Sequence, residues 1–165
     1  MKNIMKDKDD NYWMKKALIL ARKAASQNEV PVGAIIVKDN QLLSKAFNLK
    51  EKLQTPLAHA EVIAIHRASR KLKSWRLEDC TLYVTLEPCP MCCGVILQSR
   101  IKKVIFSTPD PKGGAASSLF NLLNDTRLNH QVEVIQGPLK EQSSLLLKKF
   151  FRKLRERKIK TIYSK

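Results

Sequence analysis

Apolar side chains recur with two different periods along this chain. In residues 11–27 they fall three or four positions apart, at Trp13, Ala17, Leu20, Ala21 and Ala24, which predicts an amphipathic helix. Residues 30–37 form a short and almost unbroken apolar run, which is typical of a buried strand. A polar turn at 38–41 separates this run from a second apolar segment at 42–47, so we expect the two strands to pair as a hairpin.

The rest of the chain alternates further strands and helices after a polar loop at residues 48–56. Strands alternating with helices favour a sheet covered on both faces, with parallel connections in its second half, and the opening hairpin makes that sheet mixed. The pattern therefore predicts a three-layer α/β/α fold around a mixed five-stranded sheet. The remaining strands are expected at 80–86, 102–107 and 131–137, and the helices from near Ala58, from about Pro90, around Leu119, and from Leu139 to about Lys158.

Length and composition indicate one folded domain over residues 1–165. The chain is long enough for a hydrophobic core, and its hydrophobic fraction of 44% argues against disorder. Its apolar runs are too short to span a membrane, and charges occupy the N-terminal positions where a signal peptide needs an apolar stretch. We therefore expect a cytoplasmic protein that does not enter membranes.

The charge balance changes the picture, because it points to a partner. The formal net charge is +16, from 31 basic and 15 acidic residues. Half of this excess lies in residues 140–165, where ten Lys/Arg oppose two Asp/Glu, in the basic helix expected at about 140–160. Such a run is often only a solvated helix face. The excess over the whole chain nevertheless favours an anionic partner, most simply a nucleic acid.

Two of the four cysteines have a spacing that carries chemistry. The four lie too close together in the sequence for a disulfide framework. Cys89 and Cys92, at an expected helix start next to two prolines, would share one helix face, where the helix dipole favours the thiolate form. Zinc binding and thioredoxin-like redox exchange both use this spacing, so the pair alone leaves both open.

A second motif decides between these two chemistries. His59 and Glu61 lie two positions apart at another expected helix start, so their side chains can converge only beyond the end of the helix. We expect the two helix starts to meet around one zinc ion. His59, Cys89 and Cys92 would supply three ligands and leave a fourth position for water, which is the signature of catalytic zinc.

The other two cysteines do not fit as a fourth ligand. Cys93 would point about 100° away from its neighbour around the helix. Cys80 lies at the far end of a strand that is roughly 20 Å long. We expect both to be packing residues.

Glu61 would then act as the catalytic acid and base. Zinc bound by two thiolates is formally neutral, so a nearby base has to help remove the proton from the water. The alternative for Glu61 is a carboxylate that only interacts with the dipole at a helix start. The neighbouring ligands favour the catalytic role.

Together these segments resemble a known family. HAE at 59–61 and TLEPCPMC at 85–92 are similar to the zinc-dependent nucleoside deaminase superfamily. The similarity to bacterial tRNA-specific adenosine deaminases covers nearly the whole chain, including EVPVGAIIV at 29–37 and FFRKLR at 150–155. The resemblance implies a cytidine-deaminase-like fold, one Zn²⁺ per subunit, and a homodimer. It also implies that zinc-activated water converts a wobble adenosine to inosine in the anticodon loop of an arginine tRNA.

The resemblance also implies substrate-binding residues. Considered alone, they would be a loop asparagine, a turn aspartate and the apolar positions of an amphipathic helix. By resemblance, Asn48 contacts the base, Val30 and Ala34 line the pocket, Asp110 lies near the nucleotide backbone, and Phe150, Phe151 and Arg152 lie near the anticodon loop.

Three positions depart from the family pattern. Thr55 stands where aspartate is common, Cys93 where alanine is common, and Ser117 where glycine is frequent. None is a proposed zinc ligand, although the first two could alter dimer or loop contacts. Glu61 is retained, so the chain should not be an inactive partner subunit.

Three other functions compete with this interpretation. A free nucleobase or nucleotide deaminase of the guanine or cytosine type would have the same zinc site, but a small neutral base does not explain the positive charge, whereas RNA phosphates do. A nucleic-acid-binding module with structural zinc would lack a fourth ligand and a use for Glu61. A redox protein would need neither the His-x-Glu motif nor a metal.

Overall fold

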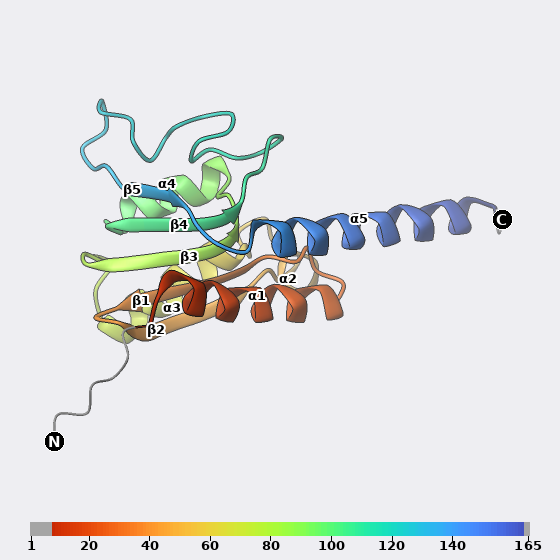
Figure 1. Ribbon diagram of the computed structural model, residues 1–165, viewed down its shortest axis with the longest axis horizontal. Coiled ribbons are helices and arrows are strands. Elements are labelled where there is room, and N and C mark those ends of the chain that lie inside the picture. The colour runs from red at the N-terminus through yellow and green to blue at the C-terminus, as the bar shows by residue number, and fades with distance from the viewer. Residues whose placement is uncertain (1–7, 164–165) are drawn as a thin grey trace, which may run out of the picture.

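A mixed five-stranded sheet organises the computed structural model, which describes residues 8–163 (Figure 1). The spatial order of the strands is β2-β1-β3-β4-β5. β1 pairs antiparallel with both β2 and β3, whereas β3, β4 and β5 run parallel. The predicted hairpin and the parallel second half are therefore confirmed. The strands are β1 (Gly33–Lys38), β2 (Gln41–Phe47), β3 (Cys80–Leu86), β4 (Lys103–Thr108) and β5 (Glu133–Gln136).

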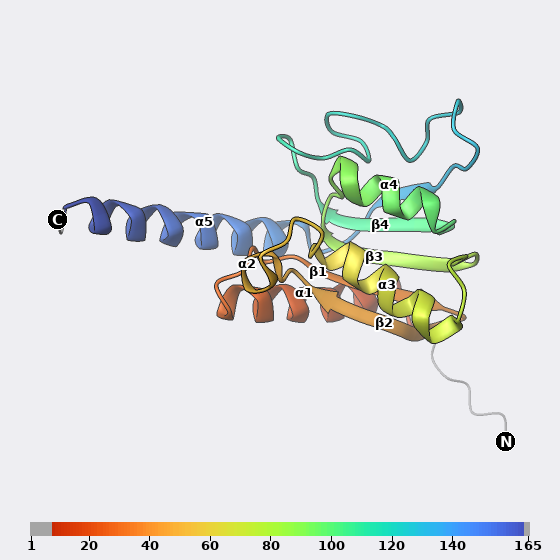
Figure 2. The same cartoon turned by 180° about the vertical axis from the view of Figure 1, so that it is seen from behind.

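Helices cover both faces of this sheet, which confirms the predicted three layers. One face carries α1 (Asp10–Ser26) and α5 (Lys140–Tyr163), and the other carries α3 (Ala60–Leu72) and α4 (Pro90–Gln98), as the two opposite views show (Figures 1 and 2). In the part of the chain that the structure describes, no helix is long and apolar enough to cross a membrane.

The strand β1 shows why its apolar run is nearly unbroken. Its side chains alternate between the two faces. Ile35 and Val37 pack with Trp13 of α1, whereas Ile36 packs in the cluster that includes Ala64 of α3. Because both faces of this strand are buried, neither can be polar.

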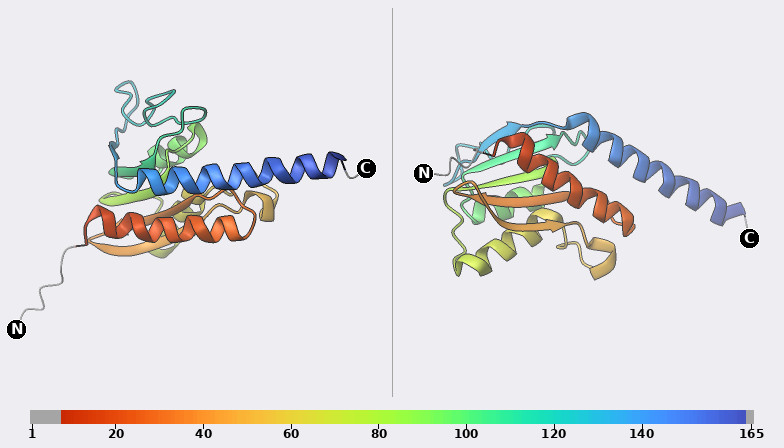
Figure 3. Two further views of the ribbon diagram at one scale, coloured as in Figure 1. Left: turned by 45° about the vertical axis from the view of Figure 1, so that its right-hand side comes forward. Right: turned by 60° about the horizontal axis from the view of Figure 1, so that its bottom comes forward.

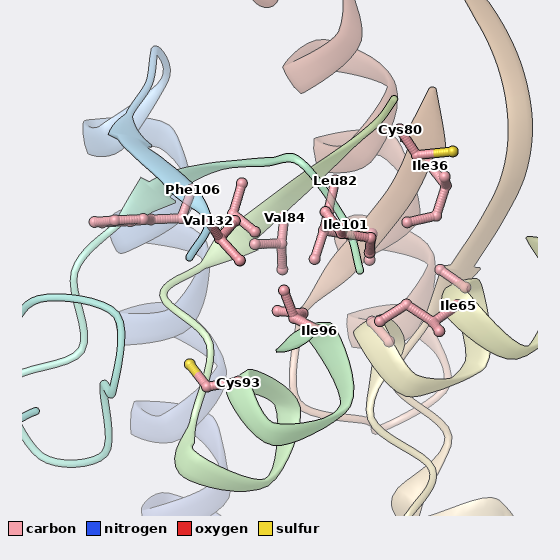
Figure 4. Packing of buried hydrophobic residues seen from close by; sticks show 14 of the residues in the cluster. Ile36, Ile65, Cys80, Leu82, Val84, Cys93, Ile96, Ile101, Phe106 and Val132 are labelled. Carbon is pink, nitrogen blue, oxygen red and sulfur yellow. The ribbon is translucent and has the colours of Figure 1, made fainter. Parts of the chain in front are cut away.

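Cys80 and Cys93 lie in the core on the α3–α4 side of the sheet (Figure 4). Both are fully buried, and the Cys93 thiol donates to the carbonyl of Pro88 at 3.6 Å. Burial raises the pKa of Cys93 to about 12, so its thiol stays protonated. The prediction that these two cysteines are packing residues is confirmed.

Two local predictions are wrong. No helix forms around Leu119, since residues 109–132 connect β4 to β5 through turns and irregular structure. Within the loop expected at 48–56, a short helix α2 (Lys50–Leu53) is present. In both places a carboxylate from a distant part of the chain accepts the backbone N–H groups: Glu87 for the first segment and Glu29 for the second.

The predicted basic helix is confirmed as α5, which has 24 residues. Its first half packs against β4 and β3, and the remainder extends beyond the sheet (Figure 3). Residues 151–160 are all exposed. The helix therefore presents most of the basic C-terminal segment to solvent.

Candidate active site

The site lies where α3 and α4 begin. His59 is the N-cap residue of α3 and Cys89 is the N-cap residue of α4, each with extended backbone dihedrals. An N-cap side chain commonly bonds a backbone N–H of its own helix. Neither His59 nor Cys89 makes such a bond, so both side chains are available to each other. Pro90 at the start of α4 favours the change from the end of β3 into a helix.

Three potential metal ligands converge at this point. The Nδ1 atom of His59 lies 3.5 Å from the Sγ atom of Cys92 and 3.7 Å from that of Cys89. All three ligand atoms lie within 4.8 Å of one another. Tetrahedral zinc with ordinary Zn–S and Zn–N bond lengths places its ligand atoms about 3.6 Å apart. The cluster therefore has the donor set and the spacing of a catalytic zinc site.

The hydrogen bonds within this cluster prepare Cys89 for metal binding. The pKa of Cys89 falls to about 4, mainly because the Cys92 thiol donates to it and also because His59 does. The pKa of Cys92 is raised in turn, since it holds the shared proton. The hydrogen bond between His59 and Cys89 also raises the pKa of His59. The lowered pKa favours the thiolate form of Cys89, which is the form that binds metal.

Glu61 lies in the first turn of α3 and is only 4% exposed. Burial raises the pKa of its carboxyl above the ordinary value for glutamate. Such a shift brings a carboxyl closer to the range in which it can both accept and donate a proton near neutral pH.

A cavity of about 180 Å³ lies over these groups. It brings together six of the residues that the sequence singles out: Val30, Asn48, His59, Glu61, Cys89 and Asp110. Cys92 is fully buried and is not among the residues that line the cavity. Ala34 is placed elsewhere, since it is fully buried in the core cluster of β1 and the α3–α4 side.

A larger groove of about 750 Å³ adjoins the cavity and runs between the loop after β4 and α5. Val30 and Asp110 line both spaces. Phe151 lines the groove, whereas Phe150 lines a separate small pocket between α1 and α5. Arg152 is exposed and forms an ion pair with Glu156 at 3.9 Å. Of the three expected C-terminal residues, only Phe151 therefore lines the groove beside the cavity.

Two buried carboxylates around the cavity have no role in the sequence-based assignment. Glu29 accepts hydrogen bonds from Asn48 Nδ2 at 3.2 Å and from the backbone N–H groups of Glu51 and Lys52 at 3.1 and 2.7 Å. It thereby holds both the Asn48 side chain and the start of α2. Glu87 lines the cavity and holds the loop after β4. The one available signal was the position of each carboxylate beside an apolar strand.

Comparison with known proteins identifies the family. A family model described as MafB19-like deaminase matches residues 8–155. The tRNA-specific adenosine deaminase of Bacillus subtilis is 48% identical over 149 residues, which cover 90% of this chain and 92% of that protein. The chain belongs to the tRNA-specific adenosine deaminase family. Its fold also agrees with that of a solved tRNA:A34 deaminase, with a TM-score of 0.80 and 36% identity over 83% of this chain and 99% of that one.

The fold extends to deaminases with another substrate. A guanine deaminase from Nitrosomonas europaea superposes with a TM-score of 0.76 at 20% identity, covering 86% of this chain and 84% of that one. At this identity the likeness shows the fold alone. The choice of substrate must therefore be argued from the residues around the cavity and from the charge of the chain.

Proposed function

We propose that this protein hydrolyses the C6 amino group of adenosine at the wobble position of a tRNA anticodon loop, which gives inosine and ammonia. The observation that carries this proposal is the cluster of His59, Cys89 and Cys92 beside the buried Glu61 at one cavity. The similarity to the Bacillus subtilis enzyme over 90% of the chain supports the tRNA substrate.

The metal proposed for the cluster is one Zn²⁺ per chain, held by His59, Cys89 and Cys92. Histidine and cysteine are ligands that zinc prefers, and three protein ligands characterise its catalytic sites. When bound, the ion supplies a Lewis acid that activates a water molecule.

Glu61 moves the protons in this proposal. It accepts one proton from the attacking water and donates it to the ring nitrogen N1 of the base. It then passes the second proton of that water to the amino group, which leaves as ammonia when the C6–N bond breaks. Its burial and its place beside the ligands support this role. Asn48, held by Glu29, would hydrogen-bond the base, and Val30 would pack against it at the junction with the groove.

RNA phosphates account for the charge of the molecule. Lys112, Lys148 and Arg155 line the groove that continues from the cavity. Nucleotides that flank the target adenosine can bind there, with phosphates near these cations and a base against Phe151. Anticodon loops supply unpaired bases that can enter such a site without the full cost of opening a duplex.

The identity of the tRNA, the assembly and the location belong to the same proposal. The family resemblance favours an arginine tRNA, a homodimer and a cytoplasmic location. The molar mass in solution would test the dimer.

A side-by-side assay tests the function. The substrates are an anticodon stem-loop with adenosine at the wobble position, the same stem-loop with cytidine there, free adenosine and free guanine. We expect rapid inosine formation only from the first, because the cavity alone offers few contacts and the smaller cytosine would leave C4 away from the site of attack. Faster release of ammonia from free guanine would establish the free-base deaminase instead, the class that the shared fold keeps as the second candidate.

A further inference from the structure

Glu87 is a buried carboxylate at the edge of the cavity that the proposed reaction does not use. It directly follows β3 and is only 2% exposed. It is not one of the grouped potential metal ligands, which are His59, Cys89 and Cys92. A buried carboxylate needs hydrogen-bond donors around it, and these donors reveal what it holds.

All of the donors to Glu87 come from the loop that follows β4. Four are backbone N–H groups, and both carboxylate oxygens are used. The bonds come from the backbone of Asp110 at 2.9 Å, Ala116 at 3.2 Å, Ser117 at 2.7 Å and Ser118 at 2.8 Å, and from the hydroxyls of Ser117 at 3.4 Å and of Ser118.

This arrangement replaces regular secondary structure in the loop. Residues 109–118 contain neither helix nor strand, so their backbone N–H groups have no ladder to join. Gly114 shows how closely the loop wraps around the carboxylate, because a Cβ atom there would lie 2.4 Å from the Glu87 carboxyl. The loop therefore takes its shape from one side chain that belongs to another part of the fold.

The loop in turn orients Asp110. One oxygen of the Asp110 carboxylate accepts the backbone N–H groups of Lys112 at 3.0 Å and Gly113 at 3.1 Å. Its carbonyl accepts the N–H of Gly114 at 2.8 Å. Asp110 lines both the cavity and the groove, so the turn that Glu87 anchors fixes a side chain at the junction of the two spaces.

We propose that Glu87 is a positioning residue for substrate binding. It acts through the loop at 110–118, holds Asp110 at the entrance to the cavity, and so orients the nucleotides next to the target base without taking part in proton transfer. This inference rests on the proposed function for its substrate, but the anchoring of the loop can be measured without any reaction.

The first test is Glu87→Gln in the zinc-loaded protein. The substitution keeps the volume but replaces one acceptor oxygen by an NH₂ group that faces backbone donors. We expect unchanged zinc content and faster amide hydrogen exchange in residues 109–119. We also expect KM for the stem-loop to rise by about tenfold while kcat changes by less than about threefold. Glu133→Gln, at an exposed glutamate of β5, is the matched control. It should change neither the amide hydrogen exchange of residues 109–119 nor KM.

A double-mutant cycle tests whether Glu87 acts through Asp110. If it does, Glu87→Gln should have little further effect on kcat/KM in a protein that already carries Asp110→Ala. Effects that multiply independently would overturn the proposal. Loss of zinc or a fall in kcat at unchanged KM would also overturn it, because either result would place Glu87 with the metal or the chemistry.

Gly114→Ala tests the same contact from the loop and leaves Glu87 intact, because the added Cβ atom would push the loop away from the carboxylate. It should reproduce both the exchange pattern and the rise in KM, which keeps the inference testable if Glu87→Gln does not fold. Normal exchange and normal KM in Gly114→Ala would contradict the proposal. A wild-type protein that does not act on the stem-loop would refute the proposed function, whereas the exchange measurement would still decide whether Glu87 anchors the loop.

Discussion

At the scale of single residues, the site depends on where a side chain stands relative to a helix start. Cys92 and Cys93 are neighbours in sequence, yet one faces His59 and the other faces the carbonyl of Pro88 in the core. Their chemistry differs accordingly, since only Cys92 lies with the other ligands.

Substitution of single cysteines should separate these roles. We expect Cys89→Ala and Cys92→Ala to lose zinc, because each removes one of three ligands. Cys93→Ala should keep one zinc per chain and lose only about 1 kcal/mol of stability from the smaller side chain. Metal analysis of the purified variants measures this, and an empty site in Cys93→Ala would contradict the ligand assignment.

Glu61→Ala should fold, bind zinc and bind RNA, yet turn over slowly. Removal of a general acid or base typically costs about 10²–10⁴ in rate, and a group that serves several proton transfers can cost more. Single-turnover inosine formation with saturating enzyme gives the rate. Glu141→Ala, at an exposed position in the first turn of α5, is the control. Near-normal turnover of Glu61→Ala would exclude the catalytic role.

At the scale of elements, two buried carboxylates accept backbone N–H groups that a regular helix or strand would otherwise satisfy. Glu29 holds the start of α2, and Glu87 holds the loop where a helix was expected. These are the places where local prediction was wrong, because a window of neighbouring residues contains no sign of an acceptor that arrives from 23 or 30 positions away.

Glu29→Ala should therefore lower the free energy of unfolding by more than the loss of one hydrogen bond would. It leaves two backbone N–H groups of α2 and the amide of Asn48 without their acceptor, and an unsatisfied buried donor costs about 1–3 kcal/mol. Chemical denaturation would measure the loss in free energy of unfolding. Glu51→Ala, exposed in α2 itself, is the control and should cost less than about 0.5 kcal/mol. Equal losses in the two variants would refute the anchoring role of Glu29.

Shortening α5 after Arg152 should weaken RNA binding and leave zinc in place. The removed residues 153–165 include six Lys/Arg and one glutamate, and residues 153–160 are exposed. Each lost phosphate contact should reduce the slope of log affinity against log salt by about 0.7–0.9. A full-length variant with Lys158→Gln and Lys160→Gln separates lost charge from lost helix. An unchanged slope in the truncated protein would mean that this end of the helix is only solvated.

At the scale of the whole molecule, the apolar pattern predicted the layers of the fold, and the two motifs predicted the metal ligands. The stripe of α1 and the doubly buried run of β1 allowed the layers and the opening hairpin to be predicted, because burial on a face imposes a period, whereas the order of the strands came from the structure. The metal cluster was predictable since both motifs stand at helix starts. Ala34 was assigned to the pocket by resemblance but lies in the core, and Phe150 lines a separate pocket, because position along a strand or helix decides which face a side chain occupies.

Metal removal should lower the stability of the whole fold, because the ligands join α3 to α4 beside the central strands. If zinc is present at 100 times its dissociation constant, its removal costs about 3 kcal/mol, or roughly 5–10 °C in Tm for a chain of this length. Thermal unfolding with and without a chelator measures the change, and Cys89→Ala should not respond to added zinc. An equal Tm in both conditions would contradict a metal that joins these helices.

The absence of side-chain caps at the starts of α3 and α4 would make the amount of this protein in the cell depend on zinc supply. An N-cap without its own hydrogen bond forgoes about 0.5–2 kcal/mol of helix stability, and here two adjacent helices do so at His59 and Cys89. Newly made chains that do not acquire zinc would open more often at this end of the sheet and be degraded sooner by proteases. The amount of active enzyme would then follow zinc supply through protein turnover, without any change in gene expression.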